Sequence, residues 1–105
     1  MNLKTWQRLQ RQLASGVLRL DEATLSAHSG DKWFATATPE AVALPRSAKS
    51  VSAILRFAHR HQIPVTPRGA GFGCVGGCVP LRGGIALSTA RMRRIREINE
   101  NDFVA

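Results

Sequence analysis

The residues best suited to chemistry lie in one glycine-rich segment, residues 68–78, which reads RGAGFGCVGGC. Within it Gly71, Gly73 and Gly76 spell a G-x-G-x-x-G pattern. Glycine allows positive φ angles and lets a ligand approach the backbone closely. Successive amide N–H groups in such a loop can point inward and bind an anion. Arg68 at the entrance adds positive charge, so the segment predicts a site for a diphosphate-bearing ligand.

The residues after the loop decide which kind of phosphate site this is. A Rossmann fold needs a helix that begins at the third glycine, so that the pyrophosphate lies on the helix N-terminus. Four helix-breaking residues follow Gly76 instead: Gly77, Pro80, Gly83 and Gly84. The P-loop pattern is missing as well, because no Gly-Lys-Ser/Thr follows the glycines. A backbone cradle without a helix remains, beside the plainer alternative of a flexible loop that binds nothing.

The cysteines and histidines do not form a metal site in this reading. Cys74 and Cys78 lack the spacing and the further ligands of a zinc site, so we expect small packed thiols. His59 and His61 are two residues apart on a predicted helix. Their side chains then point to different faces, which predicts surface histidines and no shared metal ion.

The net charge of +8 comes from twelve Arg and three Lys against seven acidic residues. Such a balance favours an anionic partner. Arg91, Arg93, Arg94 and Arg96 could contact nucleic acid, but the chain has no Tyr and no recognisable nucleic-acid module. We therefore expect this run to be a solvated face or a domain contact, and no nucleic-acid partner. A small basic module that binds nucleic acid or another polyanion is the rival interpretation.

The elements around the glycine segment follow from local patterns. Residues 41–44 form a short apolar run typical of a buried strand, and Ser47 is a good N-cap for a helix over residues 48–62. Residues 64–67 have a proline at each end, which favours an extended chain and predicts the next strand. Strand, helix and strand in this order predict a βαβ unit with parallel pairing. A further strand is expected at residues 85–88.

The rest of the chain gives weaker signals. Residues 2–14 have the apolar spacing of an amphipathic helix, and residues 15–40 read as a mixed segment, with a loop around residues 28–34. Residues 89–95 predict a short basic helix or turn, and residues 103–105 look like the beginning of a strand. We expect structural packing for Trp33, which lies in the mixed segment.

The bulk properties limit the class of protein. A chain of 105 residues with 44% hydrophobic and 21% charged residues is one globular domain or part of one. The N-terminus has no continuous apolar run, so neither a signal peptide nor an integral membrane segment is expected. Because two cysteines make no disulfide scaffold, we expect a cytoplasmic protein.

Four segments, in this order and spacing, resemble FAD-linked oxidases with the vanillyl-alcohol oxidase and p-cresol methylhydroxylase type of FAD-binding domain. They are ALPRS at 43–47, IPVTPRGAG at 63–71, the pair Gly76-Gly77, and RGGIALS at 82–88. The likeness extends over residues 28–105 and is greatest to the glycolate oxidase D subunit and D-lactate dehydrogenase branch. It implies an α/β (α+β) fold: the first lobe of such a domain, a βαβ unit with a small, mostly parallel sheet preceded by an N-terminal helix.

The resemblance also implies a function. Residues 1–40 would be an N-terminal helix and irregular lead-in, and residues 41–105 the first α/β lobe of a flavin-dependent oxidoreductase that oxidises a 2-hydroxy acid such as glycolate or D-lactate. Carried over by position, the residues that contact FAD are Arg68, Gly69, Ala70, Gly71, Phe72, Gly73, Gly76 and Gly77. Pro45 lies near the adenine side.

The chain differs from the family pattern at several positions. The branch usually has Thr at the position of Phe72 and Leu at that of Cys74, so one hydroxyl that could bond to the cofactor is missing. The loop has no His or Tyr, and FAD is therefore expected to be bound non-covalently. In the family a second FAD lobe and a cap domain follow, or other subunits contribute, and they supply the substrate and metal residues. No catalytic residue is therefore assigned in this chain.

Overall fold

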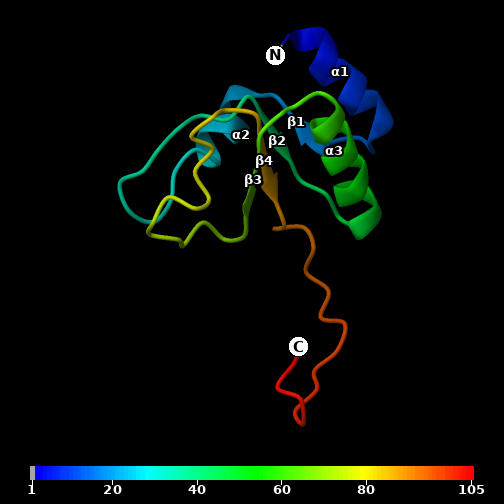
Figure 1. The fold of residues 1–105 in the computed structure, drawn as a ribbon, viewed down its shortest axis with the longest axis vertical. Helices are drawn as coiled ribbons and strands as arrows, with labels where there is room; N and C mark the ends of the chain where they lie inside the picture. The colour runs from blue at the N-terminus through cyan, green and yellow to red at the C-terminus, as the bar shows by residue number, and fades with distance from the viewer. Residues whose placement is uncertain (1) are drawn as a thin grey trace.

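A computed structural model describes residues 2–105, and Figure 1 shows a body of helices and strands from which a C-terminal arm extends. The elements in chain order are α1 (Leu3–Gln12), β1 (Leu18–Arg19), α2 (Glu22–Ala27), β2 (Ala41–Ala43), α3 (Ala48–Arg60), β3 (Val65–Arg68) and β4 (Ile85–Ser88). The helix and strands expected around the glycine segment are thus all present.

Within residues 2–105 the strands form one four-stranded sheet in the order β1-β2-β4-β3. Both β2 and β3 run parallel to β4, and β1 lies antiparallel to β2 at the edge. This confirms the small, mostly parallel α/β sheet. The expected direct pairing of the two strands that flank α3 is wrong, because β4 lies between them. The four residues of β4 are all buried, whereas β3 contains an exposed proline and suits an edge.

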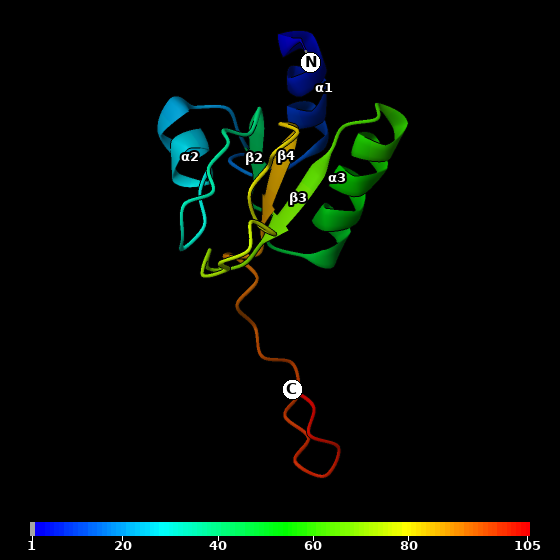
Figure 2. The same cartoon turned by 60° about the vertical axis from the view of Figure 1, so that its left-hand side comes forward.

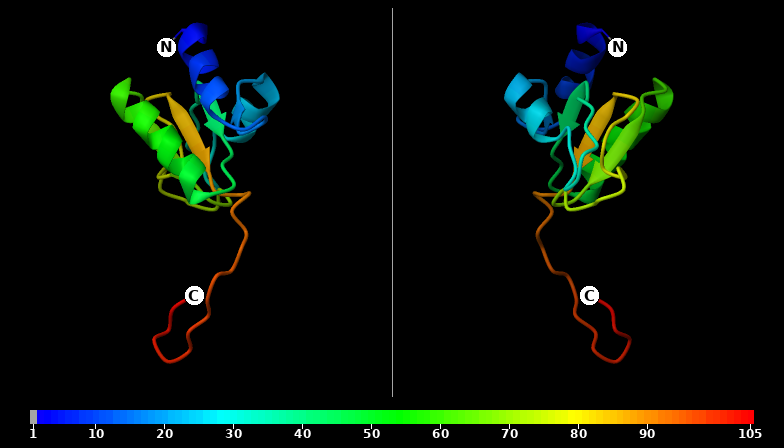
Figure 3. Two further views of the ribbon diagram at one scale, coloured as in Figure 1. Left: turned by 90° about the vertical axis from the view of Figure 1, so that its right-hand side faces the viewer. Right: turned by 90° about the vertical axis from the view of Figure 1, so that its left-hand side faces the viewer.

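Helices cover both faces of the sheet, with α1 and α3 on one face and α2 on the other (Figures 2 and 3). Helix α3 begins after Ser47, whose side chain accepts a hydrogen bond from the N–H of Ser50 at 3.2 Å, as expected of an N-cap. None of the helices in residues 2–105 is long and apolar enough to cross a membrane.

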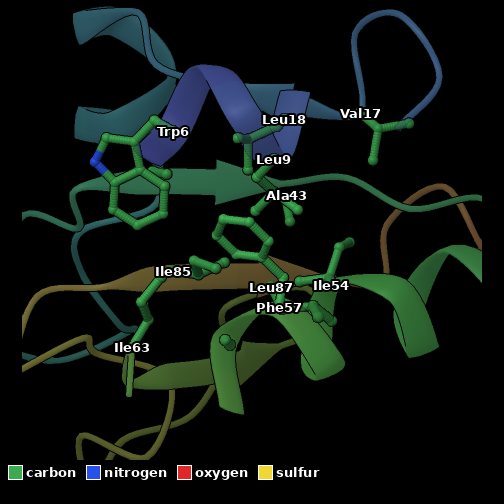
Figure 4. Close-up of a cluster of buried hydrophobic side chains, with 12 residues drawn as sticks. Trp6, Leu9, Val17, Leu18, Ala43, Ile54, Phe57, Ile63, Ile85 and Leu87 are labelled. Atoms are coloured by element: carbon green, nitrogen blue, oxygen red, sulfur yellow. The ribbon is translucent and has the colours of Figure 1, made fainter. Parts of the chain in front are cut away.

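The main hydrophobic core lies between the sheet and the helices α1 and α3 (Figure 4). Its buried residues are Trp6, Leu9, Val17, Leu18, Ala41, Ala43, Ile54, Phe57, Ala58, Ile63, Ile85 and Leu87. A smaller cluster on the opposite face joins Val42, Leu44 and Ala86 to Leu25 of α2. Alternating residues of β2 therefore point into two different cores, as a strand covered on both faces requires.

Two elements lie where no regular structure was expected, in residues 15–40. Strand β1 pairs with β2, and α2 begins after Asp21, whose carboxylate accepts a hydrogen bond from the N–H of Thr24 at 3.1 Å. The expected loop around residues 28–34 is present, apart from a single β-bridge at Gly30.

The C-terminal arm differs from one of two expectations. For residues 89–95 a short basic helix or turn was expected, and a turn closes between Thr89 and Met92, after which no helix follows. Residues 103–105 belong to no strand of the sheet, because Asn99 and Val104 pair with each other and close a local turn. An apolar segment adopts strand structure only where a neighbouring strand is available, and within residues 2–105 none lies beside the arm.

Candidate functional site

The candidate site lies at the edge of the sheet where the parallel strands β2, β3 and β4 end. In open α/β sheets this edge is where ligands bind. Residues 69–84 leave this edge after β3 and return to the start of β4. The ends of β3 and β4 are joined by the N–H of Thr89, which donates to the carbonyl oxygen of Arg68 at 3.1 Å. The glycine loop is connected to the sheet at both ends, because it begins after β3 and ends before β4.

Residues 69–73, the first half of the glycine loop, have the backbone geometry expected of an anion site. Gly71 lies at φ +80°, and a Cβ atom added there would lie 2.5 Å from Nη2 of Arg68. The guanidinium therefore folds over the space that the glycine leaves free. Within residues 2–105, the N–H groups of residues 69–73 have no protein acceptor. A row of unpaired N–H groups beside a guanidinium suits a negatively charged ligand.

Arg68 also contains a buried polar atom without a partner. Among the side chains of residues 2–105, Nη1 of Arg68 is buried and forms no hydrogen bond. A buried donor of a charged group is costly unless an acceptor reaches it. An anion in the loop would supply that acceptor, so the residues present fit a diphosphate group.

Residues 73–76, in the second half of the glycine loop, are held by the segment 31–35. The N–H of Gly76 donates to Oδ2 of Asp31 at 3.0 Å, and the N–H of Lys32 donates to the carbonyl oxygen of Gly73 at 2.9 Å. Gly76 lies at φ +80°, so its conformation suits glycine. Because its N–H is occupied by Asp31, Gly76 contributes to the loop through its backbone conformation.

Exposed aromatic residues border the loop. Phe72 is 69% exposed, and Nζ of Lys32 lies 5.3 Å from the centre of its ring. Trp33 is 68% exposed, and its ring centre lies 4.8 Å from that of Phe34. The packing expected for Trp33 is therefore wrong for this structure. The N–H of Trp33 donates to Oδ1 of Asp31 at 2.8 Å, so its main chain belongs to the turn beside the loop while its ring lies outside the core.

The thiols and histidines have the following positions. Cys74 is exposed and Cys78 half-buried, and both are free, so the expectation of packed thiols is wrong for Cys74. The neighbouring Gly76 is bonded to Asp31, so this part of the loop is held by a hydrogen bond while the Cys74 thiol remains at the surface. His59 is exposed, and His61 is half-buried against the ring of Phe57 at 4.2 Å between ring centres. In residues 2–105 no group of three or more His, Cys, Asp or Glu is placed to hold a metal ion.

A basic cavity of about 530 Å³ lies at the same edge of the sheet, between the start of α3 and the arm. Its lining residues are Arg46, Ser47, Ala48, Arg91, Met92, Arg93, Arg94 and Arg96. Pro45, which comes just before this lining at the end of β2, is buried. The basic run, which was expected to be a solvated face or a domain contact, is mostly exposed and lies beside the carboxyl ends of the strands, where it would attract anions.

Sequence reasoning did not foresee the contact between Asp31 and Gly76. The two residues are 45 positions apart, and no local pattern connects them. A weak signal was present, because Asp next to Gly30 and before Lys32 favours an Asx turn. Such a turn forms: Oδ1 of Asp31 accepts from the N–H of Trp33 at 2.8 Å.

Comparison with known proteins gives relatives for most of the chain. The glycolate oxidase subunit GlcD of Escherichia coli (strain K12) is 46% identical over 61 residues, which cover 58% of this chain and 12% of that protein. The probable mitochondrial D-lactate dehydrogenase of Danio rerio is 35% identical over 65 residues, which cover 62% of this chain and 13% of that protein. The chain thus spans about an eighth of the length of these curated relatives.

A solved structure is similar over nearly the whole chain. The 4-ethylphenol oxidase of Gulosibacter chungangensis superposes with a TM-score of 0.78 at 30% identity and covers 93% of this chain, which in turn covers 20% of that protein. This similarity confirms the expected fold class. Residues 39–105, which include the entire glycine loop, match the family described as FAD binding domain, and this match confirms FAD as the expected cofactor. The chain therefore belongs to the family described as FAD binding domain.

Proposed function

We propose that this chain is the FAD-binding portion of a flavin-dependent oxidoreductase that oxidises a 2-hydroxy acid such as glycolate or D-lactate. The observation that carries the proposal is the buried, unpartnered Nη1 of Arg68 beside a loop of unpaired N–H groups. This combination suits the diphosphate of FAD. The substrate class rests on the similarity to the glycolate oxidase subunit and the D-lactate dehydrogenase.

The proposed roles follow from the positions of the residues. The loop residues that would hold the diphosphate are Arg68, Gly69, Ala70, Gly71, Phe72, Gly73, Gly76 and Gly77. Arg68 supplies charge, the backbone at residues 69–73 supplies N–H donors, and Gly76 supplies the turn. Pro45 would border the adenine side. Because the loop has no His or Tyr, FAD is held without a covalent bond. When bound, FAD supplies the acceptor for a hydride from the α-carbon of the substrate.

Other parts of the enzyme belong to the same proposal. Residues 41–105 would form the cofactor lobe, and residues 1–40 its N-terminal lead-in. A second FAD lobe and a cap domain, or other subunits, would supply the catalytic and substrate-binding residues. The two free thiols are compatible with the cytoplasm, which we propose as the location.

The variant Gly71→Val in the full-length protein tests the cofactor site. Valine is β-branched and disfavours the φ of +80°, and its Cβ would displace the Arg68 guanidinium. We expect FAD affinity to fall by at least about tenfold, since one lost charge-assisted contact has this effect. The readout is the ratio of visible flavin absorbance to protein absorbance after purification, followed by titration with FAD.

Gly16→Val is the matched control. Gly16 has almost the same φ, +79°, but lies outside the loop, and an added Cβ would meet no atom within 4 Å. It should lower stability and leave the flavin content unchanged. If Gly71→Val retains as much FAD as the wild type, the proposed site is wrong.

The basic cavity beside α3 favours a second candidate, a module that binds nucleic acid or another polyanion without catalysis. Polyanion binding weakens steeply with salt, because phosphate contacts release counterions. A full-length protein that takes up no FAD but binds RNA with such a salt dependence would support this candidate. An FAD-containing protein without RNA binding would exclude it.

A further inference from the structure

The segment before β2 folds into a small hairpin against the glycine loop. Gly30 and Thr36 form an antiparallel bridge, and the N–H of Asp31 donates to the carbonyl oxygen of Ala35 at 3.4 Å. Asp31 lies at the start of this hairpin. Its two carboxylate oxygens each accept one backbone N–H, Oδ1 from Trp33 at 2.8 Å and Oδ2 from Gly76 at 3.0 Å.

These contacts fix a loop that has little structure of its own. Residues 69–77 contain five glycines, and glycine loses more backbone freedom on ordering than any other residue. Asp31 holds Gly76, and the N–H of Lys32 holds the carbonyl oxygen of Gly73 at 2.9 Å. Both ends of residues 73–76 are thus attached to the hairpin, and within residues 2–105 the N–H groups of residues 69–73 have no protein acceptor.

The role of Asp31 can be separated from two alternatives. A carboxylate near a diphosphate could oppose binding by charge repulsion, and in that case its removal would raise the affinity. A purely structural cap would affect folding alone. Both oxygens of Asp31 already accept backbone N–H groups, from Trp33 and from Gly76, so the carboxylate is engaged in the turn at Gly76. This engagement favours a role in shaping the loop before the ligand arrives, which lowers the ordering cost on binding.

We propose that Asp31 is a positioning residue for the cofactor: its carboxylate fixes the turn at Gly76 and thereby holds the first half of the loop in the shape that receives the diphosphate of FAD. The inference rests on the proposed function. Asp31 lies outside the glycine loop, in the segment before β2, and would be an additional residue of the cofactor site.

The variants Asp31→Ala and Asp31→Asn in the full-length protein test the proposal. Alanine removes both acceptors, so FAD should bind about tenfold more weakly or worse. Asparagine keeps one oxygen that can accept from Gly76, so its FAD affinity should lie between those of alanine and the wild type. The readout is the dissociation constant from titration with FAD. Affinity in Asp31→Ala equal to or higher than that of the wild type would overturn the proposal.

Hydrogen exchange gives a readout that does not need the cofactor. In the apoprotein, the amide of Gly76 should exchange slowly in the wild type, faster in Asp31→Ala and at an intermediate rate in Asp31→Asn. Equal exchange in all three proteins would show that the carboxylate does not fix the turn.

Asp21→Ala is the matched control. Asp21 also accepts a backbone N–H through its carboxylate, from Thr24 at 3.1 Å, but it caps α2 and does not touch the loop. Its loss should lower the melting temperature and leave FAD affinity unchanged. If Asp21→Ala weakens FAD binding as much as Asp31→Ala, the effect is general destabilisation and the positioning role is wrong. A wild type that binds no FAD overturns the proposed function itself, whereas unchanged FAD binding in Asp31→Ala overturns only the role of Asp31.

Discussion

Gly84 is the residue at which the backbone leaves least room for a side chain. It lies at φ +70°, and an added Cβ would collide with the carbonyl oxygen of Pro64. Its own carbonyl oxygen accepts hydrogen bonds from the N–H groups of Glu40 and Ala41, and its N–H donates to Oε1 of Glu40 at 3.2 Å. Gly84 therefore connects the start of β4 to the start of β2 by hydrogen bonds and lies against Pro64, the residue before β3.

We expect Gly84→Ala to lower the free energy of unfolding by at least about 2 kcal/mol, because the positive φ and the backbone collision add together. Gly16→Ala isolates the first cause, since its φ is +79° and its surroundings are open, and should cost about 1 kcal/mol. Urea denaturation of both variants provides the comparison. Equal losses would mean that the loop after Pro80 adjusts to the new side chain.

Helix α2 shows how a short element depends on its cap. The carboxylate of Asp21 accepts hydrogen bonds from the hydroxyl of Thr24 at 2.7 Å and from the N–H of the same residue, and it pairs with Arg19 at 2.9 Å. The hydroxyl of Thr24 is the largest cause that lowers the pKa of Asp21 below its ordinary value of 3.8. The folded state therefore favours the ionised carboxylate.

The lowered pKa of Asp21 determines how the stability depends on pH. Because the pKa of Asp21 is lower in the folded than in the unfolded chain, its contribution is complete well above 3.8 and is lost as the pH falls through the folded pKa. The variant Asp21→Asn keeps a capping acceptor but cannot ionise. We expect the wild type to have the higher melting temperature at about pH 6 and the difference to shrink by about pH 2. A difference that is the same at both pH values would contradict the assignment.

The elements that the sequence predicted share a property: their signals are local. Ser47 and the apolar spacing after it predicted α3, and the apolar runs predicted β2 and β4. The glycine loop was also predicted, because its composition is readable without a partner. The short strand β1 was missed, since two residues carry no period and the strand exists only through its pairing with β2.

What the sequence did not predict depends on contacts between distant segments. The position of β4 between β2 and β3 follows from the burial of all its residues, which is a property of the assembled sheet. The contact of Asp31 with Gly76 joins residues 45 positions apart. The arm lacks the expected strand at residues 103–105, because its apolar residues Ile95 and Phe103 have no core to enter within residues 2–105.

At the scale of the whole molecule, the arm is distinct from the body. It extends away from the sheet in Figure 1, and residues 93–98 are exposed throughout. Within residues 2–105 its last hydrogen bond to the body is formed by Arg91, whose Nη1 donates to the carbonyl oxygen of Gly16 at 3.2 Å. Ile95 is 73% exposed and Ile98 69%, so the arm adds little to the buried apolar area that stabilises the body.

Truncation of this chain after Met92 should therefore leave its melting temperature within about 2 °C of the intact chain, because a change below about 0.5 kcal/mol is expected at exposed sites. Circular dichroism of the two forms gives the measurement. Truncation before Arg91 serves as the control, since it removes the last anchor. If the form that ends at Met92 melts several degrees below the intact chain, the arm contacts the body in solution.

The central place of β4 has a consequence for the order in which the protein assembles. Within residues 2–105 every parallel pairing involves β4, yet β4 comes last of these strands in chain order. A growing chain cannot form the parallel sheet before Ser88 has emerged from the ribosome, and until then α3 has no complete surface to cover. Pairings between distant segments also form slowly. The glycine loop, whose second end is attached only when β4 is inserted, is therefore among the last parts of residues 2–105 to acquire its shape.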